Sequence, residues 1–226
     1  EYPAAIEFLA ERAGIKLPEN GMTEKNGVNR IRIKEMNRDA AKFFHEQLLR
    51  TPEAIAYLTE RGLSGAAVKR FGLGFSPDEP HALYNHMRKL GYNDNELIAG
   101  FLCGISKRSG KPYDYFRGRI IFPVIDTAGA VIAFGGRVTD GSLPKYLNTS
   151  DTPAFQKRKN LFALNFAKNH CGEGFILCEG YMDVIALHEA GFGQAVATLG
   201  TAITPEQARI MRRYTDRVLI SYDNDS

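Results

Sequence analysis

Short apolar runs alternate with helical patterns between residues 172 and 226. The runs "GFILCE", "GQAVAT" and "RVLISYD" have the length and composition of buried strands. Residues 181–190 and 205–214 lie between these runs, and Thr204 followed by Pro205 is a typical helix start. Strands that alternate with helices form a parallel sheet with right-handed crossovers. The pattern therefore predicts an α/β subdomain over this segment.

Two of the predicted strands end on acidic residues. Glu179 follows "FILC", Asp183 lies one helical turn later, and Asp223 and Asp225 follow "LISY". Ligands of open α/β sheets bind beyond the carboxyl ends of the strands. Four carboxylates gathered there repel one another unless a cation neutralises them, and oxygen ligands favour Mg²⁺ or Mn²⁺. In the alternative interpretation, these are ordinary acids after strands, and the helix dipole favours Asp183.

The first third of the chain has helical patterns. We expect residues 18–34 to form a polar loop or linker, because this stretch has no apolar periodicity. The expected helices run from Pro3 to Gly14, from a cap at Asp39 to Leu49, from Thr51-Pro52 to Gly62, from Ser64 over a short stretch, and over residues 80–90.

The pattern changes near residue 112. "YDYFRGRIIFPVID" and "AVIAFGGRV" are rich in strand-forming residues, and "TAGA" between them predicts a hairpin turn. The following segment, "DGSLPKYLNTSDTPAFQKRKN", has the composition of a loop. The central region is therefore expected to contain a small antiparallel sheet.

Composition limits the class of protein only broadly. A chain of 226 residues with 44% hydrophobic residues can bury a core, and its net charge of +3 is too small to indicate a nucleic-acid partner by itself. The three cysteines form no CxxC pair, so a zinc ribbon is not expected, and their odd number suits a reducing cytoplasm. No apolar run approaches the roughly 18–20 residues of a membrane helix. The chain begins at Glu1 and ends directly after the last acids, so we expect a piece of a longer protein.

Basic and aromatic residues are mixed in the central region. Such a mixture can bind phosphates and stack on unpaired bases, but it is also found in an edge strand with solvated charges. Arg137 follows two glycines, which allow either close approach to a ligand or a β-bulge. Lys145 is expected in an exposed loop. The basic residues between positions 107 and 119 are Lys107, Arg108, Lys111, Arg117 and Arg119, and a further run covers Lys157, Arg158 and Lys159.

Several of these motifs together resemble a known family. "EGYMDVIAL" followed about forty residues later by "YDND" resembles the Toprim fold. "YFRGRIIFPVIDTAGAVIAFGGRV" and "PKYLNTSDTPAFQKRKNLFAL" resemble the basic motifs of bacterial DNA primase of the DnaG type. The resemblance covers residues 38–226, and residues 1–17 resemble the segment that opens the polymerase core of that family. Three blocks in the same order make it more specific than a Toprim pattern alone.

The resemblance implies a fold and a division of the chain. The fold would be an α+β N-terminal subdomain, with helices and a small mixed or antiparallel sheet, followed by an incomplete α/β Toprim-like subdomain with a parallel sheet. The division would be an opening segment and linker over residues 1–37, a basic subdomain over 38–171 and a partial Toprim subdomain over 172–226.

The resemblance also implies roles for individual residues. Glu179, Asp223 and Asp225 would be catalytic, and together with Asp183 they would hold Mg²⁺ or Mn²⁺. No zinc is expected in this part of the protein. Nucleotide-binding residues would be Arg137, Lys145, Tyr146 and Asn148. DNA-binding residues would be Arg70, Lys111, Arg117, Arg119, Lys157 and Arg158.

The function implied by the resemblance is the synthesis of short RNA primers on single-stranded DNA from ribonucleoside triphosphates. The full-length protein would also contain a zinc-binding domain and bind the replicative helicase. It would act in the bacterial cytoplasm, at the nucleoid, and not at a membrane. Two alternatives remain open: a non-catalytic fragment that binds single-stranded DNA or nucleotide, and another Toprim enzyme such as a nuclease or topoisomerase.

Overall fold

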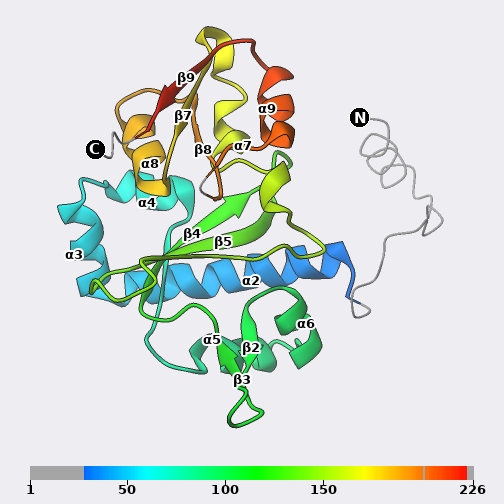
Figure 1. Ribbon diagram of the computed structural model, residues 1–226. Coiled ribbons are helices and arrows are strands. Elements are labelled where there is room, and N and C mark those ends of the chain that lie inside the picture. Colours follow the sequence, from blue (N-terminus) through cyan, green and yellow to red (C-terminus); the bar gives the residue numbers. More distant parts are fainter. Residues whose placement is uncertain (1–27, 201, 223–226) are drawn as a thin grey trace, which may run out of the picture.

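The computed structural model describes residues 28–200 and 202–222, and Figure 1 shows their arrangement. The long helix α2 lies across the middle of the molecule. An antiparallel sheet covers one side of α2, and a smaller group of α5, α6, β2 and β3 covers the other (Figure 1). The parallel sheet with α7, α8 and α9 lies beyond the antiparallel sheet.

The helices are α2 (Arg30–Leu49), α3 (Pro52–Glu60), α4 (Gly65–Phe71), α5 (Ala82–Lys89), α6 (Asp94–Ala99), α7 (Leu164–Ala167), α8 (Tyr181–Glu189) and α9 (Pro205–Arg212), with the short 3₁₀ turns η1 (Lys157–Lys159) and η2 (Cys171–Glu173).

The α2 helix begins earlier than the sequence predicts. Asn29 is its N-cap, and the Asn29 side-chain oxygen accepts a hydrogen bond from the Arg32 backbone N–H at 2.8 Å. The expectation of a loop or linker was therefore wrong for residues 30–34, and Asp39 lies inside the helix instead of capping it. Residues 18–27 and the helix expected from Pro3 lie outside the described residues.

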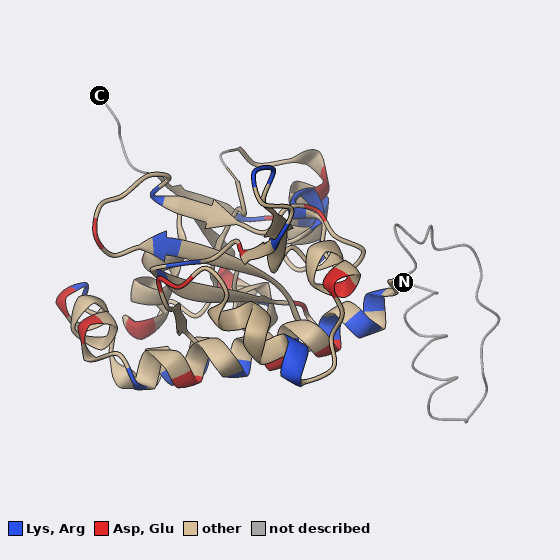
Figure 2. Cartoon of the chain, turned by 90° about the horizontal axis from the view of Figure 1, so that it is seen from below, with Lys and Arg blue, Asp and Glu red and all other residues tan. Residues whose placement is uncertain are grey.

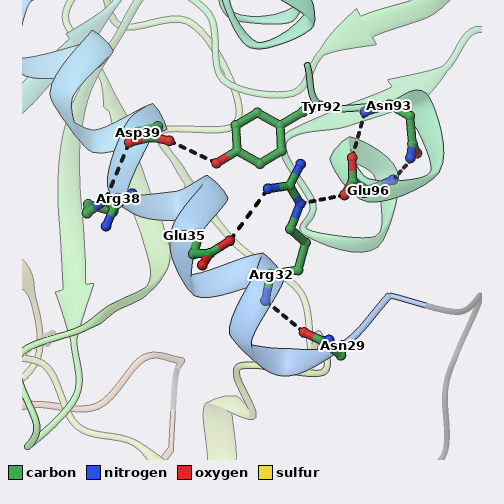
Figure 3. A network of polar contacts seen from close by, with 8 residues as sticks. All are labelled: Asn29, Arg32, Glu35, Arg38, Asp39, Tyr92, Asn93 and Glu96. Atoms are coloured by element: carbon green, nitrogen blue, oxygen red, sulfur yellow. Dashed lines mark hydrogen bonds and ion pairs between the residues drawn. The ribbon is translucent and has the colours of Figure 1, made fainter. Parts of the chain in front are cut away.

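A network of polar contacts explains why the first turns of α2 are held in place (Figure 3). The Arg32 Nε donates to Glu96 Oε1 of α6 at 2.6 Å, and the Arg32 guanidinium lies 4.3 Å from the centre of the Tyr92 ring. The Tyr92 hydroxyl donates to Asp39 at 2.8 Å. Burial, followed by this bond to Asp39, raises the pKa of Tyr92 to about 12, so the hydroxyl stays protonated and remains a donor. The polar residues that resembled a linker therefore make tertiary contacts.

The remaining helix predictions for the described residues are confirmed within one or two residues. Gly62 follows α3 with a φ of +79°, and the Ser64 side chain caps α4 by accepting from the Ala67 N–H. Helix α9 begins at Pro205, and the Thr204 hydroxyl accepts from the Gln207 N–H. The short helix α6 was not predicted, although Asn93 and Glu96 form a capping box at its start.

The antiparallel sheet has the strand order β1-β4-β5-β6. The predicted hairpin is confirmed, because β4 pairs with β5 in antiparallel register. Residues 146–148 form a strand on the free edge of β5, so the expectation of a loop was wrong there. The strand forms because β5 offers an unpaired edge, which the local sequence does not reveal. The strands of this region are β1 (Gly74–Ser76), β2 (Cys103–Ile105), β3 (Pro112–Asp114), β4 (Arg119–Ile125), β5 (Val131–Val138) and β6 (Tyr146–Asn148), with β2 and β3 paired separately.

The C-terminal sheet is parallel, as predicted, with the strand order β8-β7-β9. Its strands are β7 (Phe175–Cys178), β8 (Ala195–Ala197) and β9 (Val218–Ser221). One cluster of buried side chains joins this sheet to the rest of the molecule: it includes Leu58 of α3, Phe122 of β4, Tyr181 of α8 and Ala197 of β8. The two sheets therefore share a core. The predicted fold class, an α+β region followed by a parallel α/β region, is confirmed.

Helices long and apolar enough to cross a membrane are absent from the part of the chain that the structure describes.

A buried carboxyl group caps α5 from a distant part of the chain. Asp114 of β3 is 1% exposed, and its two oxygens accept hydrogen bonds from the Leu83 and Tyr84 backbone N–H groups at 2.7 and 2.9 Å. The residue before the helix, His81, makes no side-chain cap. Burial raises the pKa of Asp114 from 3.8 to about 6, although the two N–H donors oppose the rise.

The raised pKa of Asp114 predicts a pH-dependent contribution to stability. Because the folded state holds this proton more tightly than the unfolded state, the contribution is fully present below about pH 4 and is lost as the pH rises through about 6. Between about pH 5 and about pH 8, the wild type should lose about 1 kcal/mol more of its unfolding free energy than Asp114→Asn loses. Urea unfolding of both proteins at the two pH values measures this, and equal losses would contradict the assignment.

Candidate nucleotide and metal site

The carboxyl ends of β7 and β9 lie side by side. Cys178 pairs with Ser221, so Glu179 and Tyr222 are the next residues on adjacent strands. Partial burial and then the charge of Glu179 raise the pKa of Tyr222, which agrees with this proximity. Asp223 and Asp225 follow Tyr222 directly in the sequence but lie outside the described residues. The parallel register thus places Tyr222, the residue before Asp223, at the edge of the sheet where Glu179 lies.

The first turn of α8 holds the second described carboxylate. Asp183 Oδ2 accepts a hydrogen bond from the Gly180 backbone N–H at 3.1 Å, which fixes the turn between β7 and the helix. Glu179 and Asp183 are both exposed, and neither makes an ion pair with a described residue. Two exposed carboxylates without a protein cation suit a hard divalent metal ion. We call residues 179–183 the acid turn.

Toprim-like domains generally bind a divalent metal ion. Among residues 28–200 and 202–222, no three His, Cys, Asp or Glu side chains gather closely enough to hold one. The described part of the chain therefore supplies Glu179 and Asp183, and the predicted remaining acids lie outside it.

Arg137 lies between two aromatic rings. It is 8% exposed, its Nη1 donates to the Tyr146 hydroxyl at 2.7 Å, and its guanidinium lies 5.3 Å from the Tyr146 ring centre and 5.9 Å from that of Tyr57. Within the described residues, Arg137 has no carboxylate partner at ion-pair distance. A buried cation with no carboxylate partner makes this part of the surface attractive to phosphate.

The acid turn and Arg137 meet at Tyr146. Burial raises the pKa of Tyr146, Arg137 opposes this rise, and the charge of Asp183 adds to it. The Tyr146 hydroxyl bonds to Arg137, and the Tyr146 ring centre lies 6.4 Å from that of Tyr181 in the acid turn. The structure brings together residues predicted to bind metal and residues predicted to bind nucleotide.

Lys145 is exposed directly before β6, as the sequence predicts. The loop before it is supported by Arg119, whose Nη1 donates to the Pro144 carbonyl at 2.9 Å. Arg119 is 7% exposed, and burial lowers its pKa, while Asp140 in the same loop opposes this effect. The structure therefore places Arg119 beneath the loop that presents Lys145.

Asn148 bonds in two directions to the parallel-sheet region. Its Oδ1 accepts a hydrogen bond from the Tyr181 hydroxyl at 2.9 Å, and its Nδ2 donates to the Leu199 carbonyl at 3.3 Å. Asn148 thus lies beside the other predicted nucleotide-binding residues of β6, and the amide group ties that strand to α8.

The two glycines of β5 make room for side chains of the protein itself. A Cβ at Gly135 would meet the Tyr181 ring, and one at Gly136 would lie 2.8 Å from the Phe116 ring. Both glycines pair regularly with β4, and the irregularity in that register is at Val124 and Ile125. A β-bulge at the glycines was therefore a wrong expectation.

The other predicted DNA-binding residues lie farther apart. Arg70 is exposed on α4, and its guanidinium lies 5.0 Å from the Phe166 ring centre. Lys111 lies in the β2–β3 hairpin, on the opposite side of α2 from α8 (Figure 1). Arg117 is exposed just before β4. Lys157 and Arg158 form η1, where Arg158 lies 3.9 Å from Glu206. In Figure 2, basic and acidic segments alternate along α2, and other basic segments lie elsewhere on the chain. Positive charge is therefore not confined to one element.

Sequence reasoning missed Tyr57 and Tyr181 as members of the site. Tyr57 is on α3, about eighty residues before Arg137, and no local pattern connects them. Tyr181 had a signal, because it lies inside "EGYMD" between two predicted metal ligands. The acids that define this motif, Glu179 and Asp183, lie two positions to either side, whereas the Tyr181 ring packs inward.

Comparison with known proteins agrees with this geometry. Residues 43–168 match the family model described as DNA primase catalytic core, N-terminal domain, and residues 176–226 match the Toprim-like model. The chain is 43% identical over 228 residues to the DNA primase of Clostridium acetobutylicum, covering all of this chain and 38% of that protein. It is 39% identical to the DNA primase of Deinococcus radiodurans, covering 98% of this chain and 38% of that protein.

Solved structures of similar fold are primase catalytic domains. The RNA polymerase domain of the Mycobacterium tuberculosis primase DnaG has a TM-score of 0.80 at 33% identity, covering 88% of this chain and 68% of that one. A DnaG primase catalytic domain bound to single-stranded DNA has a TM-score of 0.78 at 35% identity, covering 87% and 64%. The zinc-binding and RNA polymerase domains of the Aquifex aeolicus primase have a TM-score of 0.79 at 35% identity, covering 100% and 54%.

A basic antiparallel region joined to a parallel sheet with acids at its carboxyl edge defines a Toprim-containing protein. Within that class, the chain belongs to the family of bacterial DNA primases of the DnaG type. It spans about two fifths of the length of the curated relatives it matches.

The close packing of Tyr181 on Gly135 predicts a steric effect on stability. In Gly135→Ala, the new methyl group would meet the Tyr181 ring, so Tyr181 or β5 has to shift, at a cost of about 2 kcal/mol. Gly65→Ala is the matched control, because a Cβ there meets nothing within 4 Å. Urea unfolding of both variants tests this, and equal effects of the two substitutions would contradict the packing argument.

Proposed function

We propose that this chain is the catalytic region of a DNA-dependent RNA polymerase that makes short RNA primers on single-stranded DNA. The main support is that Tyr146 contacts both Arg137, through a hydrogen bond, and Tyr181 of the acid turn, with ring centres 6.4 Å apart. Nucleotidyl transfer needs anionic metal ligands beside cations that hold a triphosphate, and this junction brings the two together. The relatives, which are named as DNA primases, support the same reaction.

Glu179, Asp223 and Asp225 are the proposed catalytic acids, with Asp183 as a further metal ligand. Magnesium or manganese bound there would favour deprotonation of the attacking 3′-hydroxyl and neutralise charge on the reacting phosphate. Glu179 and Asp183 are suited to this role because they are exposed and form no ion pair with a cation of residues 28–200 or 202–222. The hydrogen bond from Gly180 to Asp183 holds the acid turn in one conformation. We propose no zinc site in this part of the protein.

Arg137 and Lys145 are the proposed ligands of the ribonucleoside triphosphate. Tyr57 and Tyr146 restrict the guanidinium of Arg137, so little conformational freedom is lost when it binds phosphate. Lys145 is exposed, and the flexible stem of a lysine lets its ammonium group follow the phosphates as a point charge. Tyr146 and Asn148 complete the same edge of β6.

The proposed template contacts are charge-based. Arg70, Lys111, Arg117, Lys157 and Arg158 would bind phosphates of single-stranded DNA, and the predicted DNA-binding residue Arg119 would act through the Lys145 loop that it supports. The described chain presents Arg117 and Arg158 to solvent. Such binding should weaken as salt is raised.

We further propose that the full-length protein carries a zinc-binding domain and contacts the replicative helicase. Its substrates would place it in the bacterial cytoplasm at the nucleoid. The division into residues 1–37, 38–171 and 172–226 is part of this proposal, and the two matched family regions support its last boundary.

Primer synthesis from single-stranded DNA, ribonucleoside triphosphates and Mn²⁺ tests the proposed function. Glu179→Gln should lower the rate at least about a hundredfold, because one anionic ligand contributes several kcal/mol of charge stabilisation. Glu173→Gln is the matched control, as Glu173 is also exposed but belongs to η2. DNA nicking without RNA product would favour a nuclease or topoisomerase. Salt-dependent DNA binding with no synthesis by the wild type would favour a non-catalytic binding fragment.

Equilibrium titration with a ribonucleoside triphosphate tests Lys145 separately. Lys145→Ala should weaken binding about tenfold, which corresponds to about 1.4 kcal/mol for one charge-assisted contact. Lys89→Ala is the control, because Lys89 is exposed at the end of α5 on the other side of α2. Unchanged affinity of the Lys145 variant would remove this residue from the nucleotide site.

A further inference from the structure

Tyr181 makes one polar contact from an otherwise apolar position. It is 5% exposed, its ring stacks on Phe122 with centroids 4.9 Å apart, and it meets the Phe162 ring edge-on at 4.8 Å. Its hydroxyl donates to Asn148 Oδ1. Burial raises the pKa of Tyr181.

Tyr181 is also part of the acid turn. It is the first residue of α8, two positions after Glu179 and two before Asp183. The backbone that positions both carboxylates is therefore the backbone that carries this ring. Because the ring is locked between β4, β5 and Phe162, the start of α8 has little freedom to move relative to the antiparallel sheet.

Asn148 links Tyr181 to β6, the strand of the proposed phosphate-binding residues. It lies on β6, two residues after Tyr146 and three after Lys145, and it pairs with Gly135 across the strand. Its amide nitrogen also donates to Leu199, just after β8. One side chain thus ties the strand of the proposed phosphate-binding residues to two segments of the parallel-sheet region.

The hydroxyl is not needed for the packing itself. A phenylalanine would make the same contacts with Phe122 and Phe162, and it would fit the space above Gly135 equally well. What phenylalanine lacks is the hydrogen bond to Asn148, which joins the acid turn to β6. The hydroxyl therefore has a role other than filling the core.

We propose that Tyr181 is a positioning residue, whose hydrogen bond to Asn148 fixes the acid turn against β6 so that metal ion and triphosphate are bound together. This inference rests on the proposed function. Tyr181 touches neither ligand, and it acts through Asn148 and through the backbone of α8. Loss of the bond would leave the metal ligands and the phosphate-binding residues intact. It would reduce only the gain in triphosphate affinity that metal binding produces.

The test compares binding of a ribonucleoside triphosphate in EDTA with binding in saturating Mn²⁺. In Tyr181→Phe, the affinity in EDTA should equal that of the wild type, and the gain on adding Mn²⁺ should be about fivefold smaller. Mn²⁺ also binds the nucleotide in solution, but this effect is the same for both proteins and does not alter the difference between their gains. The melting temperature should fall by only about 2–4 °C, as expected for the loss of one hydrogen bond.

Two further variants make the test specific. Tyr214→Phe is the control, because Tyr214 also packs on the parallel sheet, against Phe175, but lies outside the proposed site. This control should leave the Mn²⁺-dependent gain unchanged. In an Asn148→Ala background, Tyr181→Phe should reduce the gain no further, because the two side chains act through one bond.

The outcomes separate this role from the proposed function. If Tyr181→Phe shows the wild-type gain, or if it weakens binding equally in EDTA and in Mn²⁺, the positioning role is overturned while the proposed function stands. If the wild type itself binds nucleotide no better with Mn²⁺ than without it, the proposed function fails, and the role of Tyr181 fails with it.

Discussion

The packing of the Tyr181 ring on the bare backbone of Gly135 is the contact on which the arrangement of the two sheets depends. Because Gly135 has no Cβ, α8 can approach β5 closely enough for the ring to stack on Phe122. That approach joins the antiparallel and parallel regions in one buried core. It also sets the acid turn beside β6, so the same contact that stabilises the fold determines the geometry of the candidate site.

Charge around this junction is left unbalanced within the protein. Arg137 is nearly buried between two tyrosines and pairs with no carboxylate of the described chain, while Glu179 and Asp183 pair with no cation among the same residues. Burying a guanidinium without a counterion costs free energy. A fold that separates its positive and negative groups in this way is suited to ligands that bring both charges, such as a metal ion with a triphosphate. Stability and ligand binding are thus in competition at this site.

Local patterns predicted well where structure is decided locally. The caps at Ser64 and Thr204, the β4–β5 hairpin and the alternation of strands and helices after residue 172 all depend on neighbours in sequence. Helix α6 was missed despite its local capping box, and the other failures lie where distant groups decide. The start of α2 depends on contacts of Arg32 and Asp39 with the segment around Tyr92, and β6 depends on the free edge of β5. Asp114 caps α5 from a strand thirty residues away, which no local rule reveals.

The same division holds for the site. The sequence by itself determined the family, the fold class and the types of residue at the site, because acids that end parallel strands and basic motifs in a fixed order are local features of the chain. Only the tertiary structure decided that Arg137 is enclosed by Tyr57 and Tyr146, that Arg119 supports the Lys145 loop, and that Tyr181 bonds to Asn148. These contacts join segments that are far apart in sequence, and they form only when the shared core brings the two sheets together.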